Sequence, residues 1–304
     1  MDLHYLEIFN AVAQHESYKK ASDILHISQP ALSVQIKKLE EQIGLKLFNK
    51  IGNKICLSEN GFMLQGYTNR IFDIIEELEN GIADKKGYIG GTLHLGGSNT
   101  PGTYLLPEII GEFKKQYPTI EINLDIANTT EVAHLINNGT LDIAINGGSY
   151  LYSNYIFAEK LLDDKLIIVA SPENPYCNHQ NITRDDLSKM NFVVHKTNSQ
   201  LYIYYKKLID ELDLPENISM CLGNIDAIKR AVGSNLGVTL IPYVAVKFEL
   251  QFGLLKRLNA PDFEFDYSYS LIYNKNKALS SASIKFIEFI REHMKDYSFN
   301  DQPY

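Results

Sequence analysis

The sequence has few cysteines and lacks the long apolar runs of membrane proteins. It contains three cysteines among 304 residues, and Cys56, Cys177 and Cys221 lie far apart without a CxxC pair. This favours reduced structural thiols over a disulfide framework or a metal site. No apolar run reaches the roughly eighteen residues of a membrane-spanning helix, and the Met1 end does not resemble a secretion signal. We therefore expect a cytoplasmic protein without a membrane span, metal or cofactor.

Catalytic signatures are also missing. The sequence contains no GxSxG, HExxH or P-loop motif and no paired carboxylates with a supporting histidine, and its eight histidines do not cluster. The segment GGSNTPG at 96–102 lacks the GxGxxG spacing of a dinucleotide-binding loop. We assign no catalytic residue and expect no enzyme.

Acidic residues exceed basic ones, but unevenly along the chain. Of 29 Lys and Arg and 37 Asp and Glu, seven of each sign fall in residues 1–60, which leaves 22 basic and 30 acidic residues in 61–304. A net charge of −8 repels nucleic acid, whereas the first sixty residues are neutral. If residues 1–60 bind DNA, their net charge cannot supply the affinity. The affinity must then depend more on dimerisation and on contacts to bases.

Residues 17–43 contain two short helical patterns separated by a tight corner. Ser17 is a candidate N-cap for a helix over 18–25, and His26-Ile27 leaves room only for a turn. Ser28 is a candidate cap for the next helix, with Pro30 in its first turn. The spacing predicts a helix-turn-helix.

The second helix has one face to pack and one to contact DNA. At 100° per residue Leu32, Ile36, Leu39 and Ile43 share a stripe, and Val34 lies opposite. Side chains on the free face suit a major groove, where glutamine pairs with adenine and apolar groups meet the thymine methyl.

The alternative is an ordinary amphipathic helix pair, which is far commoner than a DNA-binding one. Small Ala21 at the corner favours DNA binding, because it lets two helices approach closely. The only charged residues between Gln42 and Ser58 are Lys46, Lys50 and Lys54, which suits a loop facing phosphates.

Segments 6–22, 25–50 and 57–61 resemble the winged helix-turn-helix of LysR-type transcriptional regulators, and a length of 304 is typical of that family. Lys50 and Asn53 stand where the family usually has arginine, and Val34 and Ser22 also depart from its pattern. The resemblance implies promoter DNA, RNA polymerase and a homodimer or tetramer as partners. Together with the helix faces it predicts these DNA-contacting residues: Ser17, Tyr18, Lys19, Ser28, Gln29, Pro30, Ser33, Val34, Lys37, Lys38, Lys50 and Lys54.

A long helix follows over about 61–84. Leu64, Ile71 and Leu78 recur every seven residues, which indicates a coiled-coil seam, and Ser58 is its candidate cap. The alternative is a core helix inside one domain. In the resembling family this segment is a dimerising linker helix. Asp84-Lys85-Lys86-Gly87 is expected to end the helix and to open a flexible joint.

Residues beyond 87 alternate between strand and helix patterns, which predicts two α/β subdomains with parallel strands. The first series consists of strands 92–96, 120–126 and 141–146 with helices 101–116 and 129–138. The second consists of strands 166–170, 191–195, 218–222 and 237–241 with helices 199–213 and 224–234, and strand 267–273 and helix 280–296 close the chain. The resemblance implies crossings near 160–165 and 264–268, as in periplasmic solute-binding proteins.

The expected fold is therefore an all-α head, a linker helix and an α/β effector domain. The predicted domains are a winged helix-turn-helix over 1–60, a linker helix over 61–87 and an effector-binding domain over 88–304. Its subdomain I comprises 88–163 and 267–304, and subdomain II comprises 164–266.

A small, anionic effector is expected between the subdomains, where strands end and helices begin. For any one of these segments, an ordinary helix N-cap is the better explanation. Three segments that converge on one cleft would favour a binding site instead. The segments are rich in hydroxyls and amides and supply Ser98, Asn99, Thr100, Asn128, Thr129, Thr130, His195, Thr197, Asn198 and Ser199. The alternative function is a small-molecule-binding α/β protein or enzyme without a DNA-binding role. Within the family, 96–128 resembles regulators of sulfur assimilation or carbon fixation.

Overall fold

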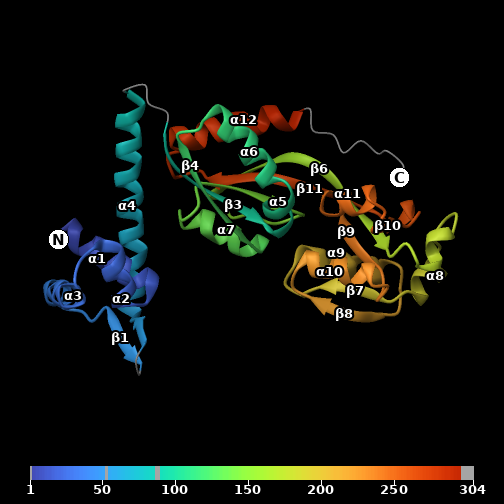
Figure 1. The fold of residues 1–304 in the computed structure, drawn as a ribbon, viewed down its shortest axis with the longest axis horizontal. Coiled ribbons are helices and arrows are strands. Elements are labelled where there is room, and N and C mark those ends of the chain that lie inside the picture. Colours follow the sequence, from blue (N-terminus) through green and yellow to red (C-terminus); the bar gives the residue numbers. More distant parts are fainter. Residues whose placement is uncertain (1, 52–53, 86–89, 296–304) are drawn as a thin grey trace. The chain divides into compact units, whose positions relative to one another are not determined.

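The computed structural model describes residues 2–51, 54–85 and 90–295, and the chain divides into two compact units, Met1–Ile82 and Ala83–Tyr304 (Figure 1). The N-terminal unit begins with three helices, α1 (Leu3–His15), α2 (Tyr18–Leu25) and α3 (Gln29–Ile43). Two antiparallel strands, β1 (Phe48–Ile51) and β2 (Lys54–Leu57), form the wing. This order agrees with the predicted winged helix-turn-helix.

The corner between α2 and α3 is built as the sequence predicts, except at one cap. Ser17 Oγ accepts a hydrogen bond from the Lys20 N–H, and Ala21 is completely buried where the helices meet. His26 ends α2 with a left-handed backbone, φ 53°. Ser28 occupies the N-cap position of α3, but its side chain makes no capping hydrogen bond. Pro30 in the first turn has no N–H to satisfy, so that end of α3 needs less from its cap.

Helix α4 (Glu59–Lys85) begins where Ser58 Oγ accepts from the Gly61 N–H, as predicted. Its apolar residues divide into two sets. Leu64 and Ile71 pack against the core of α1 to α3, so they do not belong to an open seam as expected. The exposed set, the apolar stripe, consists of Met63, Tyr67, Ile74, Leu78 and Ile82. The predicted helix end at Asp84-Lys85 was wrong, because both residues continue α4, and Lys86-Gly87 lies outside the described residues.

The second unit is built on a seven-stranded sheet. Strands β3 (Gly91–Ser98), β4 (Ile120–Ala127) and β5 (Ile143–Gly147) are parallel, and β11 (Phe265–Asn274) runs antiparallel to β5. Strand β6 (Ile156–Ala170) pairs with β11 along its first part, and with β9 (Thr239–Pro242) and β10 (Lys256–Arg257) along its last. The predicted crossings lie within β6 and β11, and the subdomain bounds themselves stay a prediction.

A smaller parallel sheet, β7 (Phe192–His195) with β8 (Ile218–Leu222), lies in the same unit and touches β9 through a bridge from Phe192 to Val238. Helices surround both sheets (Figure 1). They are α5 (Asn99–Tyr104), α6 (Leu106–Gln116), α7 (Thr129–Asn137), α8 (Arg184–Lys189), α9 (Gln200–Glu211), α10 (Ile225–Gly233), α11 (Tyr243–Gln251) and α12 (Ser281–Lys295), with 3₁₀ turns at Pro175–Asn178 and Pro261–Phe263.

One predicted helix was wrong, one predicted strand was too short, and two helices were not predicted. The predicted helix 101–116 is broken into α5 and α6 at Leu105, because Pro107 cannot continue a helix from the preceding turn. The predicted strand 166–170 is only the end of the 15-residue β6. Helices α8 and α11 were missed altogether.

The cap of α11 explains why its start was not visible in the sequence. Its N-cap residue, Pro242, offers no side-chain hydrogen bond. Asp164 in β6 supplies one instead, because its Oδ2 accepts from the Val244 N–H at 3.4 Å and from the Tyr269 hydroxyl at 2.8 Å. A residue eighty positions away therefore joins α11, β6 and β11.

Burial raises the pKa of Asp164 from 3.8 to about 6, although hydrogen bonds from Tyr269 and from backbone N–H groups oppose the shift. The folded carboxyl keeps its proton to a higher pH than the unfolded one. Between about pH 4 and pH 6 the folded state binds more protons, so this group lowers the free energy of unfolding as the pH rises.

Replacing Asp164 with asparagine should remove this titration. The free energy of unfolding of the wild type, minus that of Asp164→Asn, should be up to about 3 kcal/mol smaller at pH 7 than at about pH 4. Urea unfolding at both pH values measures the difference, and Asp163→Asn on the same strand, whose side chain is exposed, is the control. A stability difference that does not change with pH would contradict the account.

Candidate functional sites

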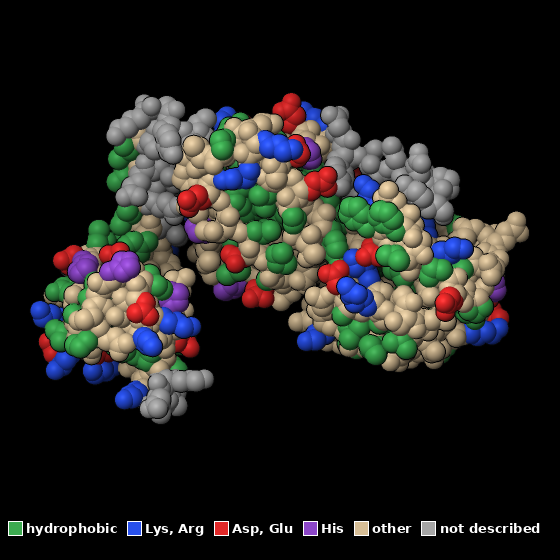
Figure 2. Space-filling view, viewed as in Figure 1, with side chains coloured by type: hydrophobic (Ala, Val, Ile, Leu, Met, Phe, Trp, Pro, Cys, Tyr) green, Lys and Arg blue, Asp and Glu red, His purple; other side chains and the backbone are tan. Residues whose placement is uncertain are grey.

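The first candidate site is the outward face of α3 with the adjoining wing. Gln29 and Ser33 are exposed, and Val34 is 53% exposed although it is apolar. On the opposite face Leu32, Ile36 and Leu39 are at most 3% exposed. Figure 2 shows basic side chains around the lower rim of the N-terminal unit, and the basic residues of 1–60 are all lysines. The outward face of α3 therefore has polar side chains that can bond to base edges, and cations lie around it.

The other predicted DNA-contacting residues differ in exposure. Ser28, Pro30, Lys19, Lys37, Lys38 and Lys50 are exposed as well. Ser17 and Tyr18 are half-buried, and the Tyr18 ring lies 6.4 Å from that of Phe48. Burial, assisted by Glu40, raises the pKa of Tyr18 to about 12, so its phenol keeps its proton. The Lys54 side chain lies outside the described part of the structure.

Glu40 fixes the wing to α3. Its Oε1 accepts from the Leu47 N–H at 2.8 Å, and its Oε2 lies 2.7 Å from the Lys46 Nζ. Burial alone would raise the pKa of Glu40, but these hydrogen bonds outweigh it and hold the pKa below its ordinary value. Lys46, expected to face phosphate, is therefore ion-paired, and Lys50 is the exposed cation of β1.

The second candidate site is a small polar pocket in the second unit, of about 30 Å³. It brings together the ends of β3 and β7, the first part of β11, and the starts of α5, α7, α9 and α10. Its lining, which we call the polar pocket, consists of Ser98, Asn99, Thr100, Asn128, Thr129, His195, Ser199, Gln200, Leu201, Ile225 and Tyr267. The three predicted N-cap segments thus converge.

The pocket presents hydrogen-bond donors without any lysine or arginine. Ser98 Oγ accepts from the Gly147 N–H at 2.8 Å, and Ser199 Oγ accepts from the Tyr202 N–H at 3.1 Å. Each hydroxyl therefore accepts one bond and keeps its own proton for another partner. The hydroxyls of Thr100 and Thr129 lie in the same lining. Such a lining favours a ligand rich in acceptor oxygens.

His195 adds a buried imidazole, 7% exposed, whose Nδ1 has no hydrogen-bond partner among the described residues. Burial lowers the pKa of His195, despite a hydrogen bond with the Lys196 backbone that favours the charged form. The imidazole is therefore neutral at neutral pH. A neutral imidazole can donate or accept one hydrogen bond, as the ligand requires.

Not every predicted pocket residue lies in the lining. Thr130, Thr197 and Asn198 are exposed and outside it. Sequence reasoning missed four lining residues, Gln200, Leu201, Ile225 and Tyr267. Gln200 and Leu201 follow the predicted Ser199 cap directly, and Tyr267 adjoins a predicted crossing. Those two signals were available in the sequence.

A larger hollow of about 860 Å³ lies along β6 and β11 and contains none of the predicted residues. It shares Tyr267 with the polar pocket. Two of its cations are already paired, Lys160 with Asp163 at 2.9 Å and Arg257 with Glu264 at 2.7 Å. We regard the smaller polar pocket as the candidate site, because its donors converge and are not neutralised.

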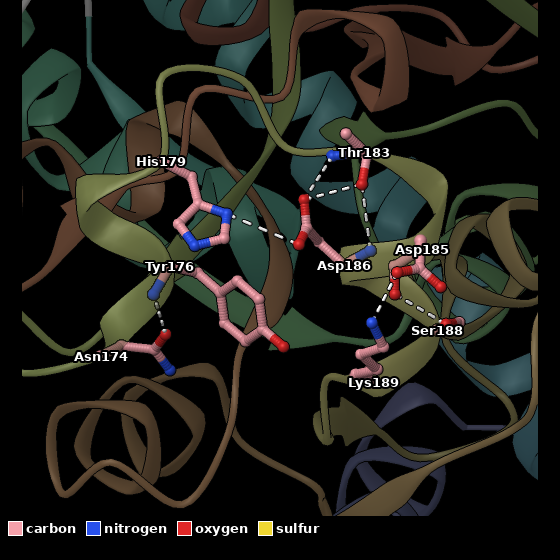
Figure 3. A network of polar contacts seen from close by, with 8 residues as sticks. All are labelled: Asn174, Tyr176, His179, Thr183, Asp185, Asp186, Ser188 and Lys189. Carbon is pink, nitrogen blue, oxygen red and sulfur yellow. Dashed lines mark hydrogen bonds and ion pairs between the residues drawn. The ribbon is translucent and has the colours of Figure 1, made fainter.

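A cluster near α8 contains a hydroxyl, a carboxylate and an imidazole (Figure 3). Asp186 lies between the other two: Thr183 Oγ1 donates to its Oδ2 at 2.7 Å, and His179 Nδ1 is 3.5 Å from its Oδ1. A catalytic triad instead needs the imidazole against the hydroxyl. The Thr183 and Asp186 side chains also each accept a hydrogen bond from the other residue's backbone N–H, so the cluster is a capping box.

Metal-binding clusters and membrane-spanning helices are absent from the described residues. No group of three or more His, Cys, Asp or Glu side chains there is placed to hold a metal ion. None of the helices in 2–51, 54–85 and 90–295 is long and apolar enough to cross a membrane.

Comparison with known proteins gives matches over both units. Residues 3–62 match the family "Bacterial regulatory helix-turn-helix protein, lysR family", and residues 86–295 match "LysR substrate binding domain". The chain is 33% identical to the "Probable RuBisCO transcriptional regulator" of Synechocystis sp. over 301 residues, 97% of this chain and 86% of that one. The sequence resembled two subgroups of regulators, those of sulfur assimilation and those of carbon fixation. The name of this relative belongs to the carbon-fixation subgroup.

Two solved structures share the fold. Full-length CbnR complexed with target DNA has a TM-score of 0.72 at 18% identity and covers 96% of this chain and 99% of that one. The Synechocystis CcmR regulatory domain in complex with 2-PG has a TM-score of 0.63 at 22% identity and covers 68% of this chain and 98% of that one. With both units matched, the chain belongs to the LysR family: it is a LysR-type transcriptional regulator with a helix-turn-helix domain and an effector-binding domain.

Proposed function

We propose that this regulator binds promoter DNA through α3 and the wing, and that a small anion in the polar pocket controls its effect on transcription. The observation that carries the proposal is the convergence of three helix starts, of which α7 and α9 have side-chain caps, on one pocket within a regulator that also has an exposed α3 face. The protein acts in the cytoplasm, where it meets promoter DNA and RNA polymerase.

The two ends of the α3 face have different roles. Gln29 lies at the start of α3, where a recognition helix contacts base edges, and glutamine pairs with adenine through two hydrogen bonds. Lys50 lies on the wing and is exposed, which suits a phosphate contact. Gln29 therefore contributes to sequence discrimination, and Lys50 contributes to affinity for any sequence.

Gln29→Ala should cost about 1–3 kcal/mol of affinity for the protein's own promoter fragment, mostly as lost discrimination. Lys50→Ala should weaken all DNA sequences alike and reduce the salt dependence by about one unit of slope. Gel shifts on the promoter fragment and on a scrambled fragment, at several salt concentrations, measure both effects. A Gln29→Ala protein that binds its promoter as tightly as wild type would show that α3 is oriented differently.

Assembly is proposed to use the apolar stripe of α4. Tyr67, Ile74 and Leu78 are between 59% and 63% exposed and lie on one face of the helix. An apolar face of this length on one long helix favours pairing with a second copy. The active form is therefore a homodimer or a tetramer built from such dimers.

Ile74→Glu should place charges within the two-fold interface and dissociate the dimer, and DNA binding should fall with it. Ile71→Glu is a poorer test, because Ile71 packs against the core of its own unit. Sedimentation measures the oligomer, with Phe62→Glu as the control, since Phe62 is 64% exposed but lies off the stripe. If Ile74→Glu stayed dimeric, the interface would lie elsewhere.

The effector is proposed to be a small anion held by hydroxyl and amide donors. Anions bind at helix starts without lysine or arginine, because free N–H groups and the helix dipole favour negative charge. The CcmR regulatory domain has the same fold and is described in complex with 2-PG. Sulfate, inorganic phosphate and 2-PG are therefore the first compounds to titrate. Genes of carbon fixation are the first targets to examine among DNA fragments bound in cells.

Thr100→Val should weaken anion binding about tenfold or more, because a hydroxyl bonded to a charged ligand contributes about 1.5–3 kcal/mol. DNA binding without effector should persist, because α3 belongs to the other unit. Calorimetric titration of the three compounds into wild type and variant measures the affinities. Equal affinities would remove Thr100 from the site.

A further inference from the structure

The polar pocket is too small for the effector class proposed for it. Its volume is about 30 Å³. A single water needs about 10–15 Å³ of such space, so the pocket holds two or three waters. A phosphate or sulfate group is larger than that. An anion of that size can be enclosed between the walls of the pocket only if these walls move apart.

Two of those walls are joined directly outside the pocket. Asn99 and Thr100 of α5 and Ile225 of α10 line it. One turn further along α5, the Tyr104 hydroxyl donates a hydrogen bond to Asp226 Oδ1 at 2.7 Å, and Asp226 lies in the first turn of α10. This bond connects the same two helices that would have to separate.

Lys229 holds both partners of that bond in place. The side chain is 9% exposed, and its Nζ lies 2.9 Å from Asp226 Oδ1, 2.8 Å from Glu249 Oε1 and 3.0 Å from the Ala245 carbonyl oxygen. The three donors of the ammonium group are thus all used. The Nζ also lies 4.6 Å from the centroid of the Tyr104 ring, within cation–π range.

The charges of this cluster favour the closed arrangement. Burial alone would raise the pKa of Asp226, but hydrogen bonds from Tyr104 and Lys229 outweigh it and keep the pKa below its ordinary value. Asp226 is therefore ionised at neutral pH, and a hydrogen bond to a charged acceptor is stronger than one between neutral groups. The Tyr104 pKa is raised, mainly by burial, so the phenol remains a donor.

We propose that Tyr104, Asp226 and Lys229 form a gate that holds α5 against α10 and keeps the polar pocket closed until an anion forces it open. The inference rests on the proposed function, because it concerns access to the same pocket. The Tyr104–Asp226 bond exists only in the closed state, so the effector must work against it. Tyr104 is thus a positioning residue that lowers the apparent affinity and does not itself contact the ligand.

Tyr104→Phe tests the gate, because phenylalanine keeps the ring over Lys229 and removes only the hydroxyl. Calorimetry with inorganic phosphate and with sulfate should show an affinity that rises by up to about tenfold over wild type. Tyr202→Phe is the control: Tyr202 lies on α9 and its hydroxyl donates to the carboxylate of Glu216, beyond the end of that helix, at 3.4 Å. Its loss should leave the affinity unchanged. An unchanged or lower affinity for Tyr104→Phe would overturn the gate.

Hydrogen exchange on the full-length protein without ligand gives a second readout. Amides of α5 and α10 should exchange faster in Tyr104→Phe than in wild type, while those of α12 should not change. Unaltered exchange in α5 and α10 would overturn the gate whatever the ligand. If wild type bound neither anion, the proposed effector chemistry would fail, and faster exchange in the variant would still support the gate.

Discussion

The antiparallel pairing of β6 with β11 is the constraint on which the rest of the effector-binding unit depends. The pairing runs from Phe265 against Leu166 to Asn274 against Ile156, so β11 is covered along its whole length. The far end of β6 then pairs with β9 and β10, while β11 also pairs with β5. Strands β5, β9 and β10 are thus attached directly to these two strands, and β3 and β4 are attached through β5.

The polar pocket and its gate lie beside this pair of strands. Tyr267 in β11 lines the pocket, and Asp164 in β6 caps α11, which carries the Glu249 and Ala245 that hold Lys229. A change in the distance between α5 and α10 would therefore reach β6 through α11. An anion that enters the pocket as proposed would thus be linked, through α11, to the strands that hold the unit together.

The sequence predicted what depends on local pattern. Apolar spacing and nearby cap residues predicted the helix-turn-helix and the Ser17 cap. They also predicted the order in which strands and helices follow one another along the first α/β series. They could not predict the start of α11, because its cap is Asp164, eighty residues away. The roles of Leu64 and Ile71 were misassigned for a similar reason, since a heptad pattern cannot show which partner covers it. The Tyr104–Asp226 bond spans 122 residues and carries no local signal at all.

The central claim is that an anion in the polar pocket alters how the full-length regulator binds its promoter. Nuclease footprinting of the protein on its own promoter fragment, with and without added phosphate, sulfate or 2-PG at constant ionic strength, tests it most directly. The account predicts that at least one of these anions changes the extent of the wild-type footprint, and that Thr100→Val requires a higher concentration for the same change. Footprints that are identical at all concentrations of all three anions would contradict it.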